Sequence, residues 1–267
     1  MEIRDKRIDD GKAFDWGKTS KEYAKYRDIY PEEFYKKVVD RGLCVSGQKV
    51  LDLGTGTGVV PRNMYKYGAD WTGTDISPEQ IEQAKLLAAE GGMQIDFRAL
   101  STEQLAGNPD FPKESFDVIT ACQCFWYFDH EKVMPVLADL LKPKGKLVIL
   151  YMAWLPFEDK IAGKSEEMIL KYSPKWSGAG STRRENWVPD VAYNFFDKID
   201  HEEYDLMVPF TKESWHGRVR ASRGIGASLN PEELARWDAE HRALLDEIAP
   251  EKFDILHYGA ITVLQKK

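Results

Sequence analysis

The sequence predicts an α/β protein with a doubly wound, seven-stranded and mostly parallel sheet. Short apolar segments alternate with segments of helical periodicity between residues 49 and 152, and the first of them ends in a glycine-rich turn. Strands that alternate with helices form a parallel sheet with helices on both faces. The 267 residues suit one large α/β domain, or a core domain with a substantial insertion.

The first part of the chain is expected to form helices before the sheet begins. Residues 21–41 have apolar side chains at helical spacing, and Pro31 divides them into two helices because it suits the first turn of the second. The elements expected after this are strands at 49–53, 71–75, 94–98, 116–121 and 146–152, and helices at 60–67, after Ser77 and at 131–141.

The alternation stops after Trp154. Residues 155–198 are rich in Trp, Lys, Gly and Ser and show no clean strand, which indicates a helical insertion that covers the ligand site. Strands at 203–209 and 260–265 and a helix at 231–248 are expected to complete the chain. The expected parts are an N-terminal helical cap (1–44), a ligand-binding domain (45–154 and 199–267) and the cover (155–198).

The composition is typical of a globular cytoplasmic protein. With 37 basic and 44 acidic residues the net charge is −7, which argues against a nucleic-acid partner. No N-terminal signal is visible, and no apolar run reaches the ~18 residues of a membrane span. The three cysteines lack regular spacing, which suits a reducing compartment and predicts no metal site.

The turn after the first strand has the glycine spacing of a nucleotide site. Gly54, Gly56 and Gly58 allow a sharp turn and a close approach of the ligand, but dinucleotide folds use the same glycines. Asp52 distinguishes between the ligands. A carboxylate here would oppose a pyrophosphate, whereas S-adenosylmethionine (SAM) has no phosphate and carries an ammonium and a sulfonium. Asp75, 21 positions after Gly54, can accept both hydroxyls of a ribose.

Four segments together resemble motifs of the class I SAM-dependent methyltransferases: 50–58, 74–77, 116–121 and 140–147. The resemblance covers residues 45–152. It implies a Rossmann-like sheet with an antiparallel last strand, and SAM as cofactor with S-adenosylhomocysteine as product. The cofactor-binding residues that it implies are Asp52, Gly54, Thr55, Gly56, Gly58, Asp75, Ile76, Ser101, Thr102, Glu103, Ala121 and Gln123.

The flanking segments 23–31, 120–129 and 211–229 resemble the trans-aconitate methyltransferase-like group, which methylates small molecules. The chain departs from this pattern twice. Ser101 and Thr102 stand where the third motif usually has Asp-Ala, and Trp126 and Tyr127 stand where the group often has His-Trp. The substrate of the group therefore cannot simply be carried over.

Aromatic and basic side chains are the candidates for the rest of the site. Tyr23 and Tyr26 share a helix face that either closes over the cofactor or packs the helix. Arg27 either pairs with the cofactor carboxylate or lies on the surface. Trp126 and Tyr127 follow the fourth strand, next to the expected position of the methyl group, and are candidate substrate-binding residues.

No catalytic base is assigned from the sequence, and two histidines are the candidates. His130 follows the fourth strand, and His216 precedes a basic segment. In that segment Arg218 and Arg220 either bind an acidic substrate or lie on a solvated helix face, paired with nearby glutamates.

The predicted function is SAM-dependent methyl transfer to a small-molecule acceptor by in-line displacement. The alternatives are a SAM-binding sensor or partner module without transferase activity, and an NAD-dependent oxidoreductase. The sequence leaves open whether the acceptor is acidic and whether the protein is a monomer or a homodimer.

Overall fold

A seven-stranded sheet organises the structure, a computed structural model that describes residues 2–183 and 188–267. The strand order is β3-β2-β1-β4-β5-β7-β6, and the last strand of the chain is antiparallel. This confirms the doubly wound, mostly parallel sheet expected from the sequence. The bounds of the strands are β1 Lys49–Leu53, β2 Asp70–Asp75, β3 Asp96–Ala99, β4 Phe116–Cys122, β5 Leu141–Trp154, β6 Phe196–Thr211 and β7 Lys252–Lys266.

The chain divides into two compact units. The sheet unit comprises Tyr30–Met152, Glu185–Tyr204 and Gly259–Lys267, and the helical unit comprises Met1–Ile29, Ala153–Arg184 and Asp205–Tyr258. The division falls within β5, β6 and β7. The expected division into a cap at 1–44, a cofactor domain at 45–154 and 199–267 and a cover at 155–198 stays a prediction. The expected cover includes residues 184–187, which lie outside the described chain, and its covering role stays a prediction.

The sheet unit contains the predicted crossover helices. They are α3 Val59–Met64, α4 Pro78–Glu90 and α5 His130–Leu140, and α2 Glu32–Val39 precedes the first strand. Because the strand order reverses between β1 and β4, right-handed crossovers place α3 and α4 on one face and α5 on the other. The α4 side chains Ile81, Ala84 and Ala88 are buried against Phe97 of β3. A larger core joins α5 to β1, β4 and β5. Ligands of such sheets bind at the reversal point, beside the carboxyl ends of β1 and β4.

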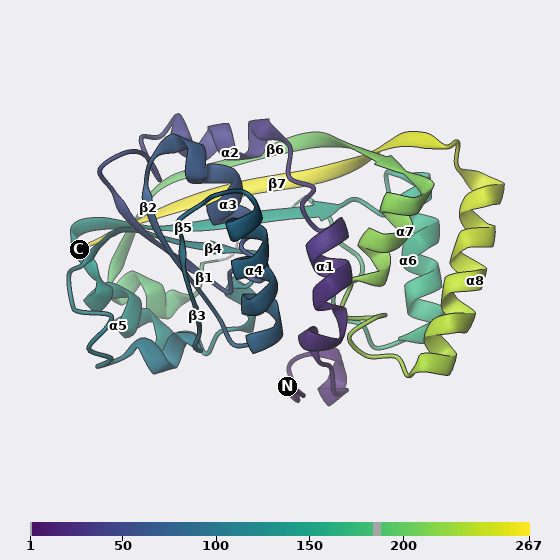
Figure 1. Ribbon diagram of the computed structural model, residues 1–267, viewed down its shortest axis with the longest axis horizontal. Coiled ribbons are helices and arrows are strands. Elements are labelled where there is room, and N and C mark those ends of the chain that lie inside the picture. Colours follow the sequence, from purple (N-terminus) through teal and green to yellow (C-terminus); the bar gives the residue numbers. More distant parts are fainter. Residues whose placement is uncertain (1, 184–187) are drawn as a thin grey trace. The chain divides into compact units, whose positions relative to one another are not determined.

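The helical unit is built from four longer helices, labelled in Figure 1. These are α1 Ser20–Tyr26, α6 Lys160–Tyr172, α7 Lys212–Arg220 and α8 Pro231–Ile248. Helix α1 packs on α7, and both α6 and α7 pack on α8 (Figure 1). The contact between α1 and α7 is close, because a Cβ atom on Gly217 would lie 2.3 Å from the ring of Tyr26. Of the helices in the described ranges, none is long and apolar enough to cross a membrane.

Three strands are longer than predicted, and the predicted bounds are corrected here. The structure extends β5, β6 and β7 well beyond 146–152, 203–209 and 260–265. Polar residues in the added stretches obscured the strand pattern, and many side chains of β6 are exposed because it is the edge strand. Residues 142–145 lie inside β5, where the register shifts against β4 and Lys144 has a φ of +63°.

Candidate functional site

The glycine turn between β1 and α3 adopts a conformation that requires glycine. Gly54, Gly56 and Gly58 have φ angles of +55°, +56° and +73°, a region that side chains disfavour. A Cβ atom on Gly54 would lie 2.5 Å from Cβ of Cys124, and one on Gly58 would lie 2.5 Å from the ring of Phe97. The turn therefore brings backbone, without side chains, to the end of the sheet where a ligand would bind.

Asp75 connects this turn to the end of β2. Its Oδ2 accepts a hydrogen bond from the Gly56 amide at 2.9 Å, and its Oδ1 accepts one from the Ser77 amide at 2.9 Å. Burial raises the pKa of the carboxyl group, while these backbone donors favour the ionised form. Each carboxylate oxygen has two lone pairs, so both retain acceptor capacity for the hydroxyls of a ribose. The geometry fits the role predicted for Asp75.

Asp52 lies in β1 and is only 1% exposed. Thr120 of β4 donates a hydrogen bond to its Oδ1 at 2.6 Å. Burial raises the pKa of Asp52 from 3.8 to about 7, although the hydroxyls of Thr120 and, more weakly, Thr55 favour the ionised form. No salt bridge within the described ranges involves Asp52. A buried carboxylate without a cationic partner fits a ligand that supplies the positive charge.

Other predicted cofactor residues lie along the same edge. Thr57 was not among the predicted residues, but its hydroxyl is buried in the turn and has no hydrogen-bond partner in the described chain, so a ligand or water would satisfy it. Ile76 is 42% exposed, which leaves an apolar surface next to Asp75. Ser101 precedes the short helix Thr102–Leu105, and its amide donates to Gln104 Oε1 at 2.8 Å. Within this helix Thr102 is buried and Glu103 is exposed.

The residues at the end of β4 and just after it are held mainly by the protein itself. Ala121 is fully buried in the core. Gln123 has a φ angle of +63°, its amide donates to Leu150 O at 3.1 Å, and its side-chain amide donates to Met152 O. These bonds fix the exit of β4 against β5. The predicted cofactor contacts of Ala121 and Gln123 remain predictions.

A single turn of helix, Phe125–Tyr127, presents the two candidate substrate residues. Trp126 is half-buried and packs edge-to-face on Tyr151, with ring centroids 5.6 Å apart. His130 Nε2 lies 3.0 Å from Phe125 O. A carbonyl oxygen only accepts, so this nitrogen is the donor. His130 therefore stabilises the turn that positions Trp126 and Tyr127, and a role as base remains untested.

Tyr23 and Arg27 belong to the helical unit and interact with each other. The Arg27 guanidinium lies over the Tyr23 ring at 4.6 Å, and its Nη2 lies 3.3 Å from the Tyr23 hydroxyl. The phenol of Tyr26 instead donates to Glu213 of α7 at 2.6 Å, which supports a packing role for that residue. The cofactor contacts expected of Tyr23 and Arg27 stay predictions, because the glycine turn belongs to the other unit.

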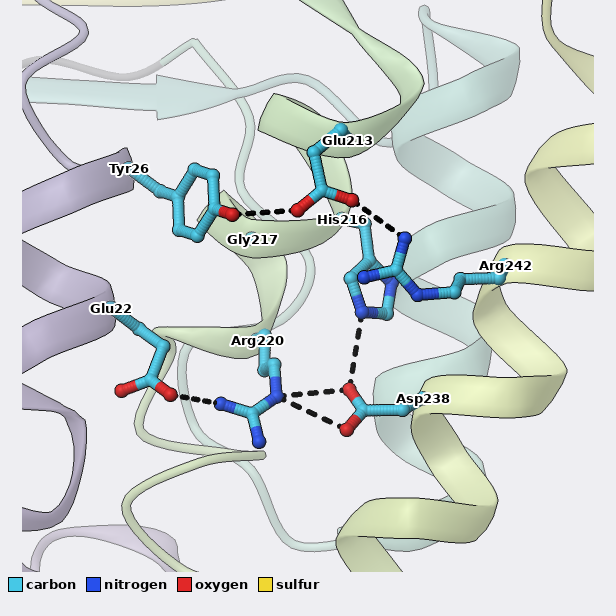
Figure 2. A pocket seen from close by; sticks show the side chains of 8 residues that line it. All are labelled: Glu22, Tyr26, Glu213, His216, Gly217, Arg220, Asp238 and Arg242. Carbon is cyan, nitrogen blue, oxygen red and sulfur yellow. Dashed lines mark hydrogen bonds and ion pairs between the residues drawn. The ribbon is translucent and has the colours of Figure 1, made fainter.

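His216 and Arg220 line a polar pocket of about 290 Å³ in the helical unit, shown in Figure 2. Arg220 pairs with Glu22 at 2.5 Å and with Asp238 at 2.9 Å. His216 is 1% exposed, and its Nε2 lies 3.1 Å from Asp238 Oδ1. Its Nδ1 lies 2.9 Å from Nδ1 of His241, a second buried histidine. Arg220 and His216, which were predicted to contact substrate, are thus already paired with carboxylates and a histidine of the protein.

Arg218 points to a different environment from its neighbour Arg220. It is 5% exposed, and its guanidinium lies 4.9 Å from the ring centroid of Trp154. The expected alternative of a solvated helix face is therefore wrong for Arg218, whereas the pairing with a glutamate occurs at Arg220. Substrate binding by either arginine remains a prediction.

Sequence reasoning missed several polar residues that the structure brings together. Thr120 lies in the motif segment 116–121, whereas Asp238 and His241 belong to no motif recognised in the sequence. Only Thr120 had a signal, since it lies in the segment 116–121 that resembles a methyltransferase motif. Among residues 2–183 and 188–267, no group of three or more His, Cys, Asp or Glu could hold a metal ion.

Comparisons with known proteins show which family the chain resembles. Residues 51–149 match the family described as "Methyltransferase domain". The ubiquinone biosynthesis O-methyltransferase of Xanthomonas euvesicatoria is 33% identical over 138 residues, which are 51% of this chain and 56% of that protein. The chain thus spans little more than half of that relative. The Xanthomonas oryzae enzyme of the same name is 32% identical over 185 residues, 69% of this chain and 74% of that protein.

A solved structure shares the fold. A Galdieria sulphuraria protein, provisionally described as a sarcosine dimethylglycine methyltransferase, has a TM-score of 0.52 with 20% sequence identity. The alignment covers 88% of this chain and 84% of that one. At this identity the likeness concerns the fold alone.

Proposed function

Since the chain belongs to the class I SAM-dependent methyltransferases, we propose that it transfers the SAM methyl group to a small-molecule acceptor by in-line displacement. The observation that carries the proposal is the pair of carboxylates around the glycine turn. Asp75 is tied to the turn through the Gly56 amide, and Asp52 is buried without a cationic partner in the described chain. Asp75 suits a ribose and Asp52 suits a cationic cofactor, whereas neither carboxylate suits a pyrophosphate.

The residues of the sheet unit have distinct roles in this proposal. Asp75 accepts the ribose hydroxyls, Ile76 offers an apolar surface to the adenine, and the glycine turn lies against the rest of the cofactor. Asp52 provides negative charge beneath the cationic end. When bound, SAM supplies an electrophilic methyl group, so the protein has to supply position and electrostatics.

The acceptor is assigned to the surface formed by Trp126 and Tyr127. His130 holds this turn through Phe125 O, and His216 is engaged by Asp238 and His241. Neither is therefore disposed as a general base, and we propose that positioning supplies most of the rate enhancement. Alignment of two reactants can contribute roughly 7–11 kcal/mol. Because the Xanthomonas relatives are named O-methyltransferases, a hydroxyl acceptor is the first class to test.

Binding measurements test the cofactor assignment. Separate calorimetric titrations with SAM, S-adenosylhomocysteine and NAD should give binding of the first two and none of NAD. Binding of NAD without SAM would instead favour an oxidoreductase. For the acceptor, small phenols and carboxylic acids are incubated with methyl-labelled SAM. Tight SAM binding without transfer to any acceptor would favour the sensor alternative.

A substitution tests the acceptor surface. Trp126→Ala should raise the KM of the acceptor while the Kd of S-adenosylhomocysteine stays unchanged. Tyr172→Ala in the helical unit serves as a control for the loss of a half-buried aromatic side chain. Equal effects on acceptor KM from both substitutions would contradict the assignment of Trp126.

A further inference from the structure

The contact between Asp52 and Thr120 lies at the centre of the sheet. The two residues are paired in the register of the neighbouring strands β1 and β4. Thr120 is fully buried, Asp52 is 1% exposed, and the Thr120 hydroxyl donates to Asp52 Oδ1 at 2.6 Å. This is the short distance of a hydrogen bond from a hydroxyl to a carboxylate. The bond fixes the carboxylate just before the glycine turn begins.

The titratable groups around Asp52 are all neutral or acidic. Asp75 at the end of β2 adds negative charge. Cys124, after β4, donates its thiol to Leu53 O at 3.0 Å, and Cys44, before β1, is fully buried. Burial and the nearby Asp52 carboxylate raise the pKa of both thiols well above the usual value, so they remain protonated. No group among these neighbours compensates a negative charge on Asp52.

A buried carboxylate in such surroundings holds its proton more tightly. Burial disfavours the charged form, and in Asp52 this raises the pKa to about 7 against the stabilising effect of the Thr120 hydroxyl. A bound cation acts in the opposite direction, because opposite charge favours the ionised form. The protonation of Asp52 and the binding of a cation at this end of the sheet are therefore thermodynamically linked.

We propose that cofactor binding releases the proton of Asp52, and that Thr120 is the positioning residue that holds its carboxylate and stabilises it once ionised. The inference rests on the proposed function, because the cofactor supplies the cation. In the step, the O–H bond of the Asp52 carboxyl group breaks and the proton passes to the buffer. One positive charge thus replaces another beside the carboxylate, so below about pH 7 the buried charge is not left uncompensated.

The linkage has a definite sign. Below about pH 7 the free protein must lose a proton to bind, so affinity falls as the pH falls; above it Asp52 is already ionised and affinity is level. At pH 6 the affinity is expected to be about tenfold weaker than at pH 8. Titration of the amino group of the cofactor would change the number of bound protons in the opposite direction. Its protonated form is the one that binds, so binding would take up protons at high pH.

Calorimetric titration with S-adenosylhomocysteine tests the proposal. Titrations at pH 6, 7 and 8, in buffers that differ in ionisation enthalpy, give the number of protons released. We expect a value approaching one at pH 6 and near zero at pH 8, with the tenfold change in Kd. Binding without proton release and with a constant Kd would overturn the proposal but leave the function intact. No binding at any pH would instead count against the proposed function.

Substitutions of Thr120 identify the source of the proton. Thr120→Val keeps the shape but removes the donor, so proton release should extend about one pH unit higher. Thr120→Ser keeps the hydroxyl and should restore the original profile. An unchanged profile in Thr120→Val would assign the proton to another group, such as Asp75, and refute the proposal. Circular dichroism checks that each variant is folded, and the wild-type pH series stands independently of them.

Discussion

Replacing Asp52 by Asn should stabilise the cofactor-free protein at alkaline pH. Folding raises the pKa of this carboxyl group from 3.8 to about 7. The folded protein therefore binds more protons than the unfolded chain between about pH 4 and pH 7, and stability falls as the pH rises through that range. A difference of about 3 units, at about 1.4 kcal/mol each, makes the ionised group cost roughly 4 kcal/mol at pH 8.

Asparagine removes the charge but does not recover all of this free energy. Its side-chain oxygen can still accept a hydrogen bond from Thr120. Its amide group, however, brings buried N–H donors, and a buried donor without an acceptor costs about 1–3 kcal/mol. The expected net gain at pH 8 is therefore about 2 kcal/mol. At about 2–4 °C per kcal/mol for a chain of this size class, the Tm should rise by roughly 4–8 °C.

Thermal unfolding without cofactor at pH 5 and pH 8 tests this reasoning. The gain should be present at pH 8 and absent at pH 5, where Asp52 of the wild type is protonated. Asp70→Asn is the matched control, because this residue also lies in a central strand but is exposed. A destabilised Asp52→Asn protein at pH 8, or an equal change at both pH values, would refute the argument that burial of an ionised carboxylate limits stability.

Three further substitutions address the turn, the ribose contact and the helical unit. Gly54→Ala should lower stability by about 2 kcal/mol or more in thermal unfolding, since it combines a φ of +55° with a clash at Cys124. Gly92→Ala should cost less, because its φ is +65° but nothing lies within 4 Å; equal losses would exclude the clash as the cause. Asp75→Asn should weaken S-adenosylhomocysteine binding about tenfold to a hundredfold by calorimetry, through loss of charge-assisted bonds; unchanged affinity would remove Asp75 from the site. His216→Phe should lower the unfolding free energy by about 1–3 kcal/mol, because Asp238 and His241 each lose one hydrogen-bond partner, and should leave that affinity unchanged. Loss of methyl transfer without loss of stability would show that His216 takes part in the chemistry.

Local patterns were sufficient to predict much of the sheet and its loop. The strand 49–53 and the helix 231–248 have the predicted bounds, because a short apolar run before glycines and a Pro-initiated amphipathic segment are both encoded by adjacent residues. The glycine turn was predicted for the same reason, since only glycine adopts those φ angles freely. Asp75 was predicted from its distance of 21 positions from Gly54 along the chain. The strands β5, β6 and β7 were predicted too short, because pairing with neighbouring strands extends them through polar residues.

The sequence by itself determined the fold class, the position of the cofactor loop and the two carboxylates beside it. Only the tertiary structure decided what those carboxylates and the basic residues contact. It placed Thr120 against Asp52 across 68 residues of chain, and joined His216 and Arg220 through Asp238. Backbone conformation follows from neighbours in sequence, whereas burial and the pairing of charges depend on segments that meet only when the chain is folded.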